Sequence, residues 1–514
     1  MNHLVVAPVI LPAFAAALLI LARLRPDLQR LLSLLATAGL VAVAVLAFGQ
    51  ATDGTVRAYR LGAWPAPFGI VLVLDRLSGL MVLLASLLSA AVLVYAMASR
   101  WDERGHHFHV LFQFQLMGIN GAFLTGDVFN LFVFFEVMLI ASYGLLLHGG
   151  GPRRLGAGFQ YVAINLVGST LFLFAVGLIY AVTGTLNMAD LAAKVGQVAP
   201  GDGALLRTGA LLLFLVFALK AAAVPLHWWL PTAYGAASAP AAALFAIMTK
   251  VGAYSIIRVY TLVFGADGGP AAGVAGPWLL PAALAALVIG ALGVLASRSL
   301  VNLVSFAVVW SMGTLLTAVA LFDPRGLAAA LYYTLHSTLI AAALFLLAEL
   351  ITSRRGDSGD LLTPAPPIAG ATLLGGLFFL AGIAMAGLPP LSGFTGKLLI
   401  LEAVRGAPAW GWIWGLLLLT SLVVVLGFAR AGSTLFWKSE AIGPATEAPG
   451  GRSDPRFAVA AAALLLGGTV ALSLFAGPVM RQIDATAAQI LDTRAYMAAV
   501  LGPERQAALQ AEAR

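Results

Sequence analysis

The sequence predicts an all-α polytopic membrane protein with about 14 transmembrane helices. Of its 514 residues, 61% are hydrophobic and only 10% are charged, whereas soluble proteins carry about 25% charged residues. Apolar blocks of about 18–30 residues recur along the whole chain, and each is long enough to cross a hydrocarbon core of about 30 Å. Polar linkers of the kind that separate soluble domains are missing from the sequence.

Each predicted span is one of these apolar blocks. We expect the first block to stay in the protein, because a basic n-region and a small-x-small cleavage site are both missing there. The twelfth span continues past a Pro-Pro break to about residue 405. The expected spans cover residues 4–22, 31–49, 71–97, 108–125, 127–147, 158–181, 208–226, 233–263, 277–296, 300–321, 326–351, 368–390, 408–432 and 456–478.

The absence of cysteine and the distribution of charge exclude several classes of function. The chain has no cysteine, which excludes disulfides, thiolate metal sites and Cys-ligated iron–sulfur clusters within it. Its net charge of +7 is spread over short loops, a pattern that favours membrane topology over nucleic-acid binding. Lys and Arg residues concentrate in the odd-numbered connections, so these are expected to be cytoplasmic and both termini to lie on the opposite side.

Two apolar segments are interrupted by proline at corresponding places. Pro225 follows closely after Lys220 in the seventh span, and Pro389 and Pro390 precede Lys397 in the twelfth. Proline breaks a helix, and paired broken segments in two halves of a chain point to a transport site. The spacing predicts two inverted five-helix repeats at spans 4–8 and 9–13. The expected parts are an N-terminal three-helix segment (1–107), a first repeat (108–263), a second repeat (277–437) and a last span with a polar C-terminal tail (438–514).

Glu136 lies in the middle of an apolar run, with hydrocarbon side chains on both sides. An acidic residue at a helix centre costs roughly 2.5–3.5 kcal/mol on insertion scales, so it usually faces a partner or a water-filled path. Lys220, Lys250 and Lys397 occupy equally apolar settings, and the surroundings place Lys250 in the middle of its helix. Burial disfavours the charged form of an amine, which makes its charge switchable by a nearby carboxylate. One acid and three amines therefore favour proton or ion handling.

His336 is a histidine deep in a predicted span. Its imidazole can carry protons near neutral pH, although a lone helix histidine is often simply hydrogen-bonded core. Three hydroxyls near it could order water or bond back to their own helix. These hydroxyl residues are Thr334, Ser337 and Thr338.

Other charged residues have simpler explanations. Asp127 and Asp75 are interpreted as helix caps, and Arg258 as the interfacial end of its span. A loop histidine group is interpreted as solvated, because it lacks an evident fourth ligand. This group consists of His106, His107 and His109.

Three blocks of sequence carry a family resemblance. Residues 118–144, GINGAFLTGDVFNLFVFFEVMLIASYG, resemble the fourth and fifth spans of the D subunit of Mrp-type multisubunit monovalent cation/proton antiporters. The pattern Lys220-x4-Pro225-x-His227 resembles the seventh-span signature of the wider group, which includes the antiporter-like proton-pumping subunits of respiratory complex I. The run from Pro389 to Lys397 is similar to its twelfth-span break.

The resemblance implies roles for the buried residues. Glu136 and Lys220 are similar to the family's ion pair, whose opening and closing gates proton movement. Lys250, His336 and Lys397 are similar to successive members of its midplane proton wire. His227 is an implied accessory residue, and so is Ser305, through which a hydrated link would run in a tenth-span region that only partly follows the family pattern.

The expected function is therefore proton translocation within a Na⁺ or K⁺/H⁺ antiporter complex of the bacterial inner membrane. Its expected partners are other membrane subunits, the lipid bilayer, protons and Na⁺ or K⁺, with no nucleic acid, metal site or cofactor, and no redox chemistry of its own. One alternative is a proton-pumping membrane subunit of a respiratory NADH:quinone or hydrogenase-linked complex. Another is a non-conducting assembly scaffold in which the buried charges only fix helix packing.

Overall fold

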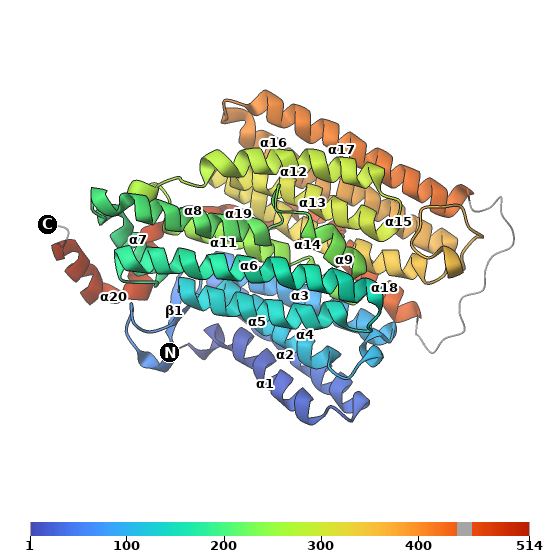
Figure 1. The fold of residues 1–514 in the computed structure, drawn as a ribbon, viewed down its shortest axis with the longest axis horizontal. Helices are drawn as coiled ribbons and strands as arrows, with labels where there is room; N and C mark the ends of the chain where they lie inside the picture. Colours follow the sequence, from blue (N-terminus) through green and yellow to red (C-terminus); the bar gives the residue numbers. More distant parts are fainter. Residues whose placement is uncertain (1, 439–454, 513–514) are drawn as a thin grey trace.

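The computed structural model describes residues 2–438 and 455–512, and nearly all of these form helices. Most helices run along one long axis, and both ends of the chain lie at the same end of the bundle (Figure 1). We call this the terminal face. The helices are α1 (Ala7–Leu21), α2 (Pro26–Ala51), α3 (Arg76–Ala98), α4 (Phe108–Leu124), α5 (Val128–Leu147), α6 (Pro152–Thr183), α7 (Met188–Lys194), α8 (Gly203–Lys220), α9 (Trp229–Ala236), α10 (Ala239–Phe245), α11 (Met248–Leu262), α12 (Gly276–Ala296), α13 (Leu300–Val319), α14 (Pro324–Thr352), α15 (Ala371–Ala386), α16 (Ser392–Ala403), α17 (Trp410–Gly432), α18 (Pro455–Leu474), α19 (Ala476–Leu491) and α20 (Thr493–Glu512).

Many of these helices have the length and composition of membrane spans. Within the two described ranges, 11 helical segments are long and apolar enough to cross a bilayer, and three shorter apolar helices, α1, α4 and α15, accompany them. These segments lie at the positions of the predicted spans. The predicted class, an all-α polytopic membrane protein, is therefore confirmed, while the number of helices that cross the membrane stays a prediction.

The third span begins later than predicted. Residues 71–74, expected to open that span, instead form strand β2 (Val71–Leu74), which pairs antiparallel with β1 (Arg57–Arg60). The reason is a capping box, in which the Asp75 carboxylate accepts from the Ser78 N–H and the Ser78 hydroxyl accepts from the Asp75 N–H. These bonds satisfy the free donors at the start of α3 and fix its first turn at Arg76.

The eighth predicted span is not one continuous helix. Residues 233–263 divide into the end of α9, then α10 and α11. Pro240 has no N–H to donate to the Ala236 carbonyl, so α9 cannot continue into α10. A second interruption follows at Ala246, whose N–H donates to the Ala243 carbonyl in a tighter turn. Lys250 consequently is the third residue of α11, although it still lies half-way along the apolar segment Ala239–Leu262.

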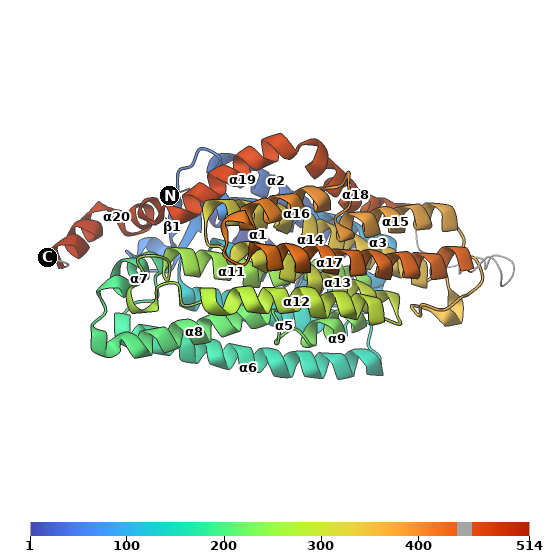
Figure 2. The ribbon, with the colours of Figure 1, turned by 90° about the horizontal axis from the view of Figure 1, so that it is seen from above.

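The C-terminal tail contains two helices that the sequence analysis did not predict. Beyond α18, the chain forms α19 and α20, which run along one side of the bundle to the terminal face (Figure 2). The buried residues of α19, among them Ile483, Ala487 and Ile490, recur at helical spacing. Such a stripe gives α19 an apolar face toward the bundle, where it packs against α3, α11 and α14.

The two halves of the chain share a helix-packing pattern. In each half, two glycines three residues apart allow one helix to approach the next, because a Cβ at either position would lie within 2.6 Å of the neighbouring helix. The contacts join α4 to α5 and α12 to α13. They pair Gly118 with Met138, Gly121 with Phe134, Gly290 with Trp310 and Gly293 with Phe306. The repeated spacing accords with two related halves, although the inverted repeats and the domain boundaries stay predictions.

The helix breaks also have matching backbones. α8 ends at Lys220 before Pro225, and α15 ends at Ala386 before Pro389 and Pro390. Beyond α8, the Ala223 N–H donates to the Ala218 carbonyl; beyond α15, the Leu388 N–H donates to the Ile383 carbonyl. The residue before each of these donors has positive φ, 51° at Ala222 and 73° at Gly387. Both interrupted helices therefore end in the same type of turn.

Candidate functional site

Glu136 lies on α5, about half-way along the helix, and is partly buried. Its carboxylate accepts a hydrogen bond from the Ser169 hydroxyl on α6. α5 and α6 pack side by side, so this bond reaches across the interface between them. The Glu136 carboxylate is thus bound by an uncharged hydroxyl and not by a cation. Such a hydrogen bond stabilises the carboxylate, but it does not add a positive charge beside it.

Lys220 lies at the last residue of α8, where the helix breaks. Its side chain is 5% exposed, and its ammonium donates to Oδ1 of Asn165 on α6 at 2.7 Å. Within the part of the chain that the structure describes, Glu136 and Lys220 form no direct ion pair. The expected partners instead bind two residues of the same helix.

These two α6 residues are functional candidates that sequence reasoning missed. Asn165 and Ser169 are four residues apart and follow Tyr161 at the same spacing, so all three lie on one face of α6. The Tyr161 carbonyl accepts from the Asn165 amide, which leaves Oδ1 turned toward the amine. The four-residue spacing was present in the sequence, but Gln160 and Thr170 on the same helix made it inconspicuous.

Lys250 follows on α11 and is 1% exposed. Its amine has no hydrogen-bond partner among the described residues. Gly252 brings α11 directly against the break after Lys220, because a Cβ there would lie 2.5 Å from the backbone nitrogen of Ala221. A buried polar group normally has a partner or an ordered water, and Lys250 differs in this from Lys220 and Lys397, whose amines bind protein oxygens.

His336 lies on α14 and is fully buried. Its Nδ1 is 2.8 Å from the Ser392 hydroxyl at the start of α16, whereas its Nε2 has no hydrogen bond of good geometry among the described residues, and the Ala384 backbone interacts with the ring. The imidazole thus joins the long helix α14 to the broken twelfth span. One ring nitrogen stays available for proton exchange.

Lys397 lies on α16, and its amine contacts the end of α15, where the twelfth span is broken. It donates to the Ala386 carbonyl and, at 2.8 Å, to the Ser421 hydroxyl on α17. The amine also stands 4.1 Å from the centre of the Trp310 ring, in the range of a cation–π contact. Gly387 makes room for it, since a Cβ there would lie 2.6 Å from the Lys397 side chain.

Two further residues supply polar atoms among these helices. The Ser311 hydroxyl on α13 and the Tyr333 hydroxyl on α14 are buried, and neither has a hydrogen-bond partner of good geometry among the described residues. The Tyr333 ring lies 5.5 Å from the His336 ring. Ser311 and Thr314 interact weakly with the Tyr333 hydroxyl, so Ser311 and Tyr333 extend the series of buried polar groups beside His336. Sequence reasoning did not select either residue.

The accessory hydroxyls behave differently from these two. Thr334, Ser337, Thr338 and Ser305 each donate to a carbonyl of their own helix. Thr334, Ser337 and Thr338 were expected either to order water or to bond back to their own helix, and the structure has the second arrangement. Ser305 bonds back in the same way. His227 is not one of these back-bonded residues; it lines a cavity of about 490 Å³ together with Arg153, Asn302 and other residues.

The histidine group does not form a metal site within the described residues. His109 is buried on α4, where its Nε2 lies 3.2 Å from Asp102, so the expectation of a solvated loop is wrong for this residue. Asp102 also accepts two hydrogen bonds from Arg30. Burial favours a higher pKa for Asp102, but the hydrogen bonds from His109 and Arg30 outweigh it and hold the pKa below its usual value.

This arrangement of broken helices and buried charges is shared with known proteins. The family described as NADH:quinone oxidoreductase/Mrp antiporter, TM matches residues 125–426. The chain belongs to this family. The match covers the helices that carry all five residues predicted to transfer protons.

Relatives within this family match the chain over nearly its whole length. The D subunit of a probable K(+)/H(+) antiporter of Rhizobium meliloti (strain 1021) is 41% identical over 98% of this chain and 98% of its own length. The D subunit of a Na(+)/H(+) antiporter of Bacillus subtilis (strain 168) is 38% identical over 98% of this chain and 100% of its own length.

A solved structure of the family agrees in fold. A chain in the structure of the Mrp complex from Dietzia sp. DQ12-45-1b superimposes with a TM-score of 0.86 at 29% identity, covering 98% of this chain and 100% of that chain. The resemblance to the D subunit of Mrp-type antiporters is therefore confirmed. As a family member with many apolar helices, the chain is a multi-pass membrane protein, and its relatives named above are antiporter subunits.

Proposed function

We propose that this chain is the proton-translocating subunit of a multisubunit Na⁺ or K⁺/H⁺ antiporter. The observation that carries the proposal is a series of ionisable groups inside the helix bundle. Glu136 is partly buried, and Lys220, Lys250, His336 and Lys397 are buried. Charged groups at membrane depth are expensive and usually serve transport. Family membership supports the same conclusion, because the relatives named above are antiporter subunits. No redox group is needed for this activity.

The mechanism is an electrostatic relay. Glu136 and Lys220 are held apart on the α6 residues Ser169 and Asn165. A proton that neutralises Glu136 removes its attraction for Lys220, and a proton that leaves it restores that attraction. In a low-dielectric interior such a change is felt over a few ångströms by the next charge. The perturbation therefore passes from Lys220 to Lys250 across the α8–α11 contact, then to His336 and Lys397.

The proposal is tested in the complete complex reconstituted in vesicles. We expect Glu136→Gln and Lys220→Ala to lose most of the pH gradient that a cation gradient drives, with the complex still assembled. Glu402→Gln is the matched control, because the Glu402 carboxylate is 60% exposed and contacts Arg405 at the surface. Wild-type rates in both test variants would refute the relay.

The proposed location is the bacterial inner membrane, with both termini on the non-cytoplasmic side. The support is the concentration of Lys and Arg in the loops at the opposite end of the bundle, which the positive-inside rule assigns to the cytoplasm. Labelling of a cysteine placed at exposed residue Asp53, on the terminal face, tests this in intact cells. Protection from an impermeant reagent in cells, with labelling in inverted vesicles, would reverse the orientation.

The proposed partners are the other membrane subunits of the antiporter complex. A respiratory alternative stays relevant because the family includes NADH:quinone oxidoreductase subunits. Co-purification with flavin and iron–sulfur subunits, rather than small membrane subunits, would favour that alternative. A passive scaffold predicts instead that neutral substitutions impair assembly and transport together.

A further inference from the structure

A buried ion pair joins α3 to α11 outside the series described above. The Arg258 guanidinium contacts the Asp75 carboxylate at 2.6 and 2.8 Å. The Arg258 and Asp75 side chains are 6% and 4% exposed. Asp75 caps α3, as expected, but it also binds Arg258. Arg258 was expected at the interfacial end of its span, and it is instead buried in an ion pair. Replacing a buried pair by apolar residues is often neutral or stabilising. Helix packing by itself therefore gives weak reason to place two charges here.

The ion pair lies in line with Lys250. Lys250, Tyr254 and Arg258 are spaced by four residues on α11 and so share one face of the helix. The Arg258 Nε donates to the Tyr254 hydroxyl at 3.4 Å, and that hydroxyl donates in turn to the Phe123 carbonyl. All three residues are buried. A polar stripe thus leads from the unpaired amine of Lys250 toward the terminal face.

The C-terminal segment covers the far side of the pair. The centre of the Tyr496 ring, on α20, is 5.2 Å from the Arg258 guanidinium. The Tyr496 hydroxyl is buried and has no hydrogen-bond partner among the described residues. The cover is attached through Gln489, whose amide accepts from the Arg76 N–H and donates to the Gly54 carbonyl.

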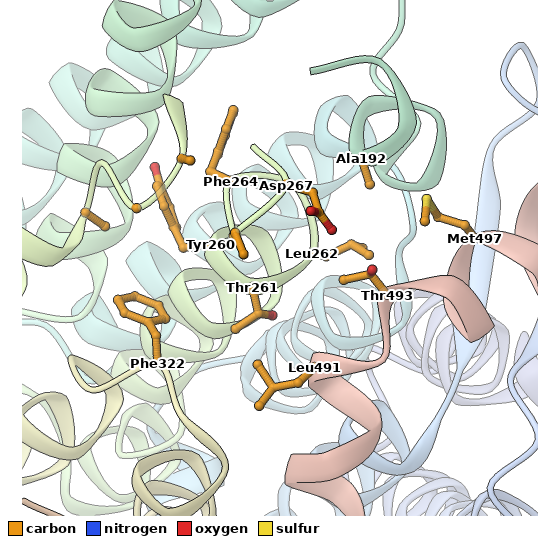
Figure 3. Close-up of a pocket in the computed structure, with 15 residues that line it drawn as sticks. Ala192, Tyr260, Thr261, Leu262, Phe264, Asp267, Phe322, Leu491, Thr493 and Met497 are labelled. Atoms are coloured by element: carbon orange, nitrogen blue, oxygen red, sulfur yellow. The ribbon is translucent and has the colours of Figure 1, made fainter. Parts of the chain in front are cut away.

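A cavity of about 530 Å³ opens beside this cover. Thr261, three residues beyond Arg258 on α11, lines it, and the C-terminal segment contributes Thr493 and Met497. Figure 3 shows Asp267 and Thr493 on either side of this space, with Thr261 below them. The polar stripe of α11 therefore ends next to a cavity with hydroxyl and carboxylate groups on its wall.

We propose that the Asp75–Arg258 pair is a proton-transfer site that connects Lys250 to this cavity, and that Tyr496 closes it. The inference rests on the proposed function and adds a second proton path to it. This path leads from Lys250 to the terminal face, and we call its end at the cavity the outlet. Asp75 is the group that accepts and releases the proton. Arg258, Tyr254 and Tyr496 are positioning residues.

The steps balance as a single proton transfer. The Lys250 ammonium gives up a proton, which passes along the Tyr254 face of α11 to the Asp75 carboxylate. Lys250 becomes neutral, Asp75 becomes a neutral acid, and Arg258 keeps its charge while its attraction to Asp75 falls. The freed guanidinium remains near the Tyr496 ring, which attracts cations. Asp75 then releases the proton to solvent in the cavity and the pair re-forms.

The first test removes the proton acceptor without leaving an unpaired charge. The variant is the double substitution Asp75→Asn with Arg258→Gln, in which Asn retains the cap of α3. We expect an assembled complex whose maximal transport rate falls at least about tenfold, as loss of a proton-transfer group does, with unchanged half-saturating cation concentration. Tyr95→Phe is the control, because it removes a buried polar group that lies on α3 outside the proposed path and donates to the Leu346 carbonyl. A wild-type rate in the assembled double variant would overturn the proposal.

The second test reports on the outlet without relying on transport. The chain has no cysteine, so single cysteines can be labelled in it with an impermeant maleimide. We expect Thr261→Cys to be labelled from the same side as Asp53→Cys, whereas Ser255→Cys, buried elsewhere on α11, is protected. Tyr496→Ala should speed the labelling of Thr261→Cys. Protection of Thr261→Cys in both backgrounds would overturn the outlet, even where the double variant does not assemble.

Failure of the outlet and failure of the relay give different results. If Glu136→Gln abolishes transport and the Asp75–Arg258 double variant does not, the outlet is wrong and the relay stands. If neither substitution changes transport, the proposed function itself is wrong.

Discussion

Asn165 offers the sharpest perturbation of the site, because its Oδ1 is the acceptor that holds the Lys220 ammonium at 2.7 Å. Asn165→Leu has nearly the same volume and keeps α6 apolar, but it leaves the buried amine without this acceptor. The Glu136 carboxylate, which interacts electrostatically with this amine, is then its expected partner. We therefore expect the variant to favour a closed Glu136–Lys220 pair that no longer opens readily.

The magnitude follows from the lost hydrogen bond. A hydrogen bond to a charged group is worth about 1.5–3 kcal/mol, and each 1.36 kcal/mol corresponds to a factor of ten in rate. Asn165→Leu should therefore slow proton translocation by about 10- to 150-fold. The balance between the open and closed arrangements shifts by the same amount, so the effect falls on the maximal rate.

The assay is cation-driven acidification or alkalinisation of vesicles that contain the complete complex. Thr170→Val is the matched control on α6, since the Thr170 side chain is exposed and bonds only back to its own helix at Leu166. An assembled Asn165→Leu complex with a wild-type rate would refute the reasoning, and so would an equal loss in Thr170→Val.

Three further predictions concern other parts of the structure. Tyr333→Phe removes a buried hydroxyl that has no well-formed hydrogen bond within the described chain, so vesicle transport should fall while thermal stability stays at the wild-type value; unchanged transport would remove Tyr333 from the path. Gly387→Ala places a side chain at φ 73° and against Lys397, which should cost about 1–2 kcal/mol from the backbone alone, seen as a lower unfolding temperature; an unchanged temperature would contradict the close approach. Asp102→Asn should lower the unfolding temperature at pH 7, because Asp102 has a depressed pKa in the folded protein; its contribution is present above the unfolded pKa near 3.9 and is lost as pH falls through the folded pKa, so wild type and variant should converge in acid.

The residues with the largest energetic cost were the ones that sequence could identify. Glu136, Lys220 and Lys397 stand out because charge in an apolar run has few explanations. The helix breaks were equally visible, since Pro225 and Pro390 remove backbone donors wherever they occur. Such residues can be recognised from their neighbours in the sequence alone, without knowing which helices pack together.

The missed features depend on helix neighbours. Asn165 and Ser169 are ordinary polar residues until α6 is known to pack against α5 and α8. The Asp75–Arg258 pair joins residues 183 positions apart, and each alone fits a cap or an interfacial end. The division of the eighth span had a local signal in Pro240, but its apolar composition outweighed that signal.

The central claim is that protons move through the buried series, and Lys250 tests it most directly. Its amine makes no hydrogen bond within the described chain, so assembly has little reason to depend on that amine. Lys250→Met retains the length and apolar stem of the side chain while removing the ionisable group. We predict an assembled complex with cation-driven proton movement reduced at least about tenfold. A wild-type rate in assembled Lys250→Met complexes would contradict the claim.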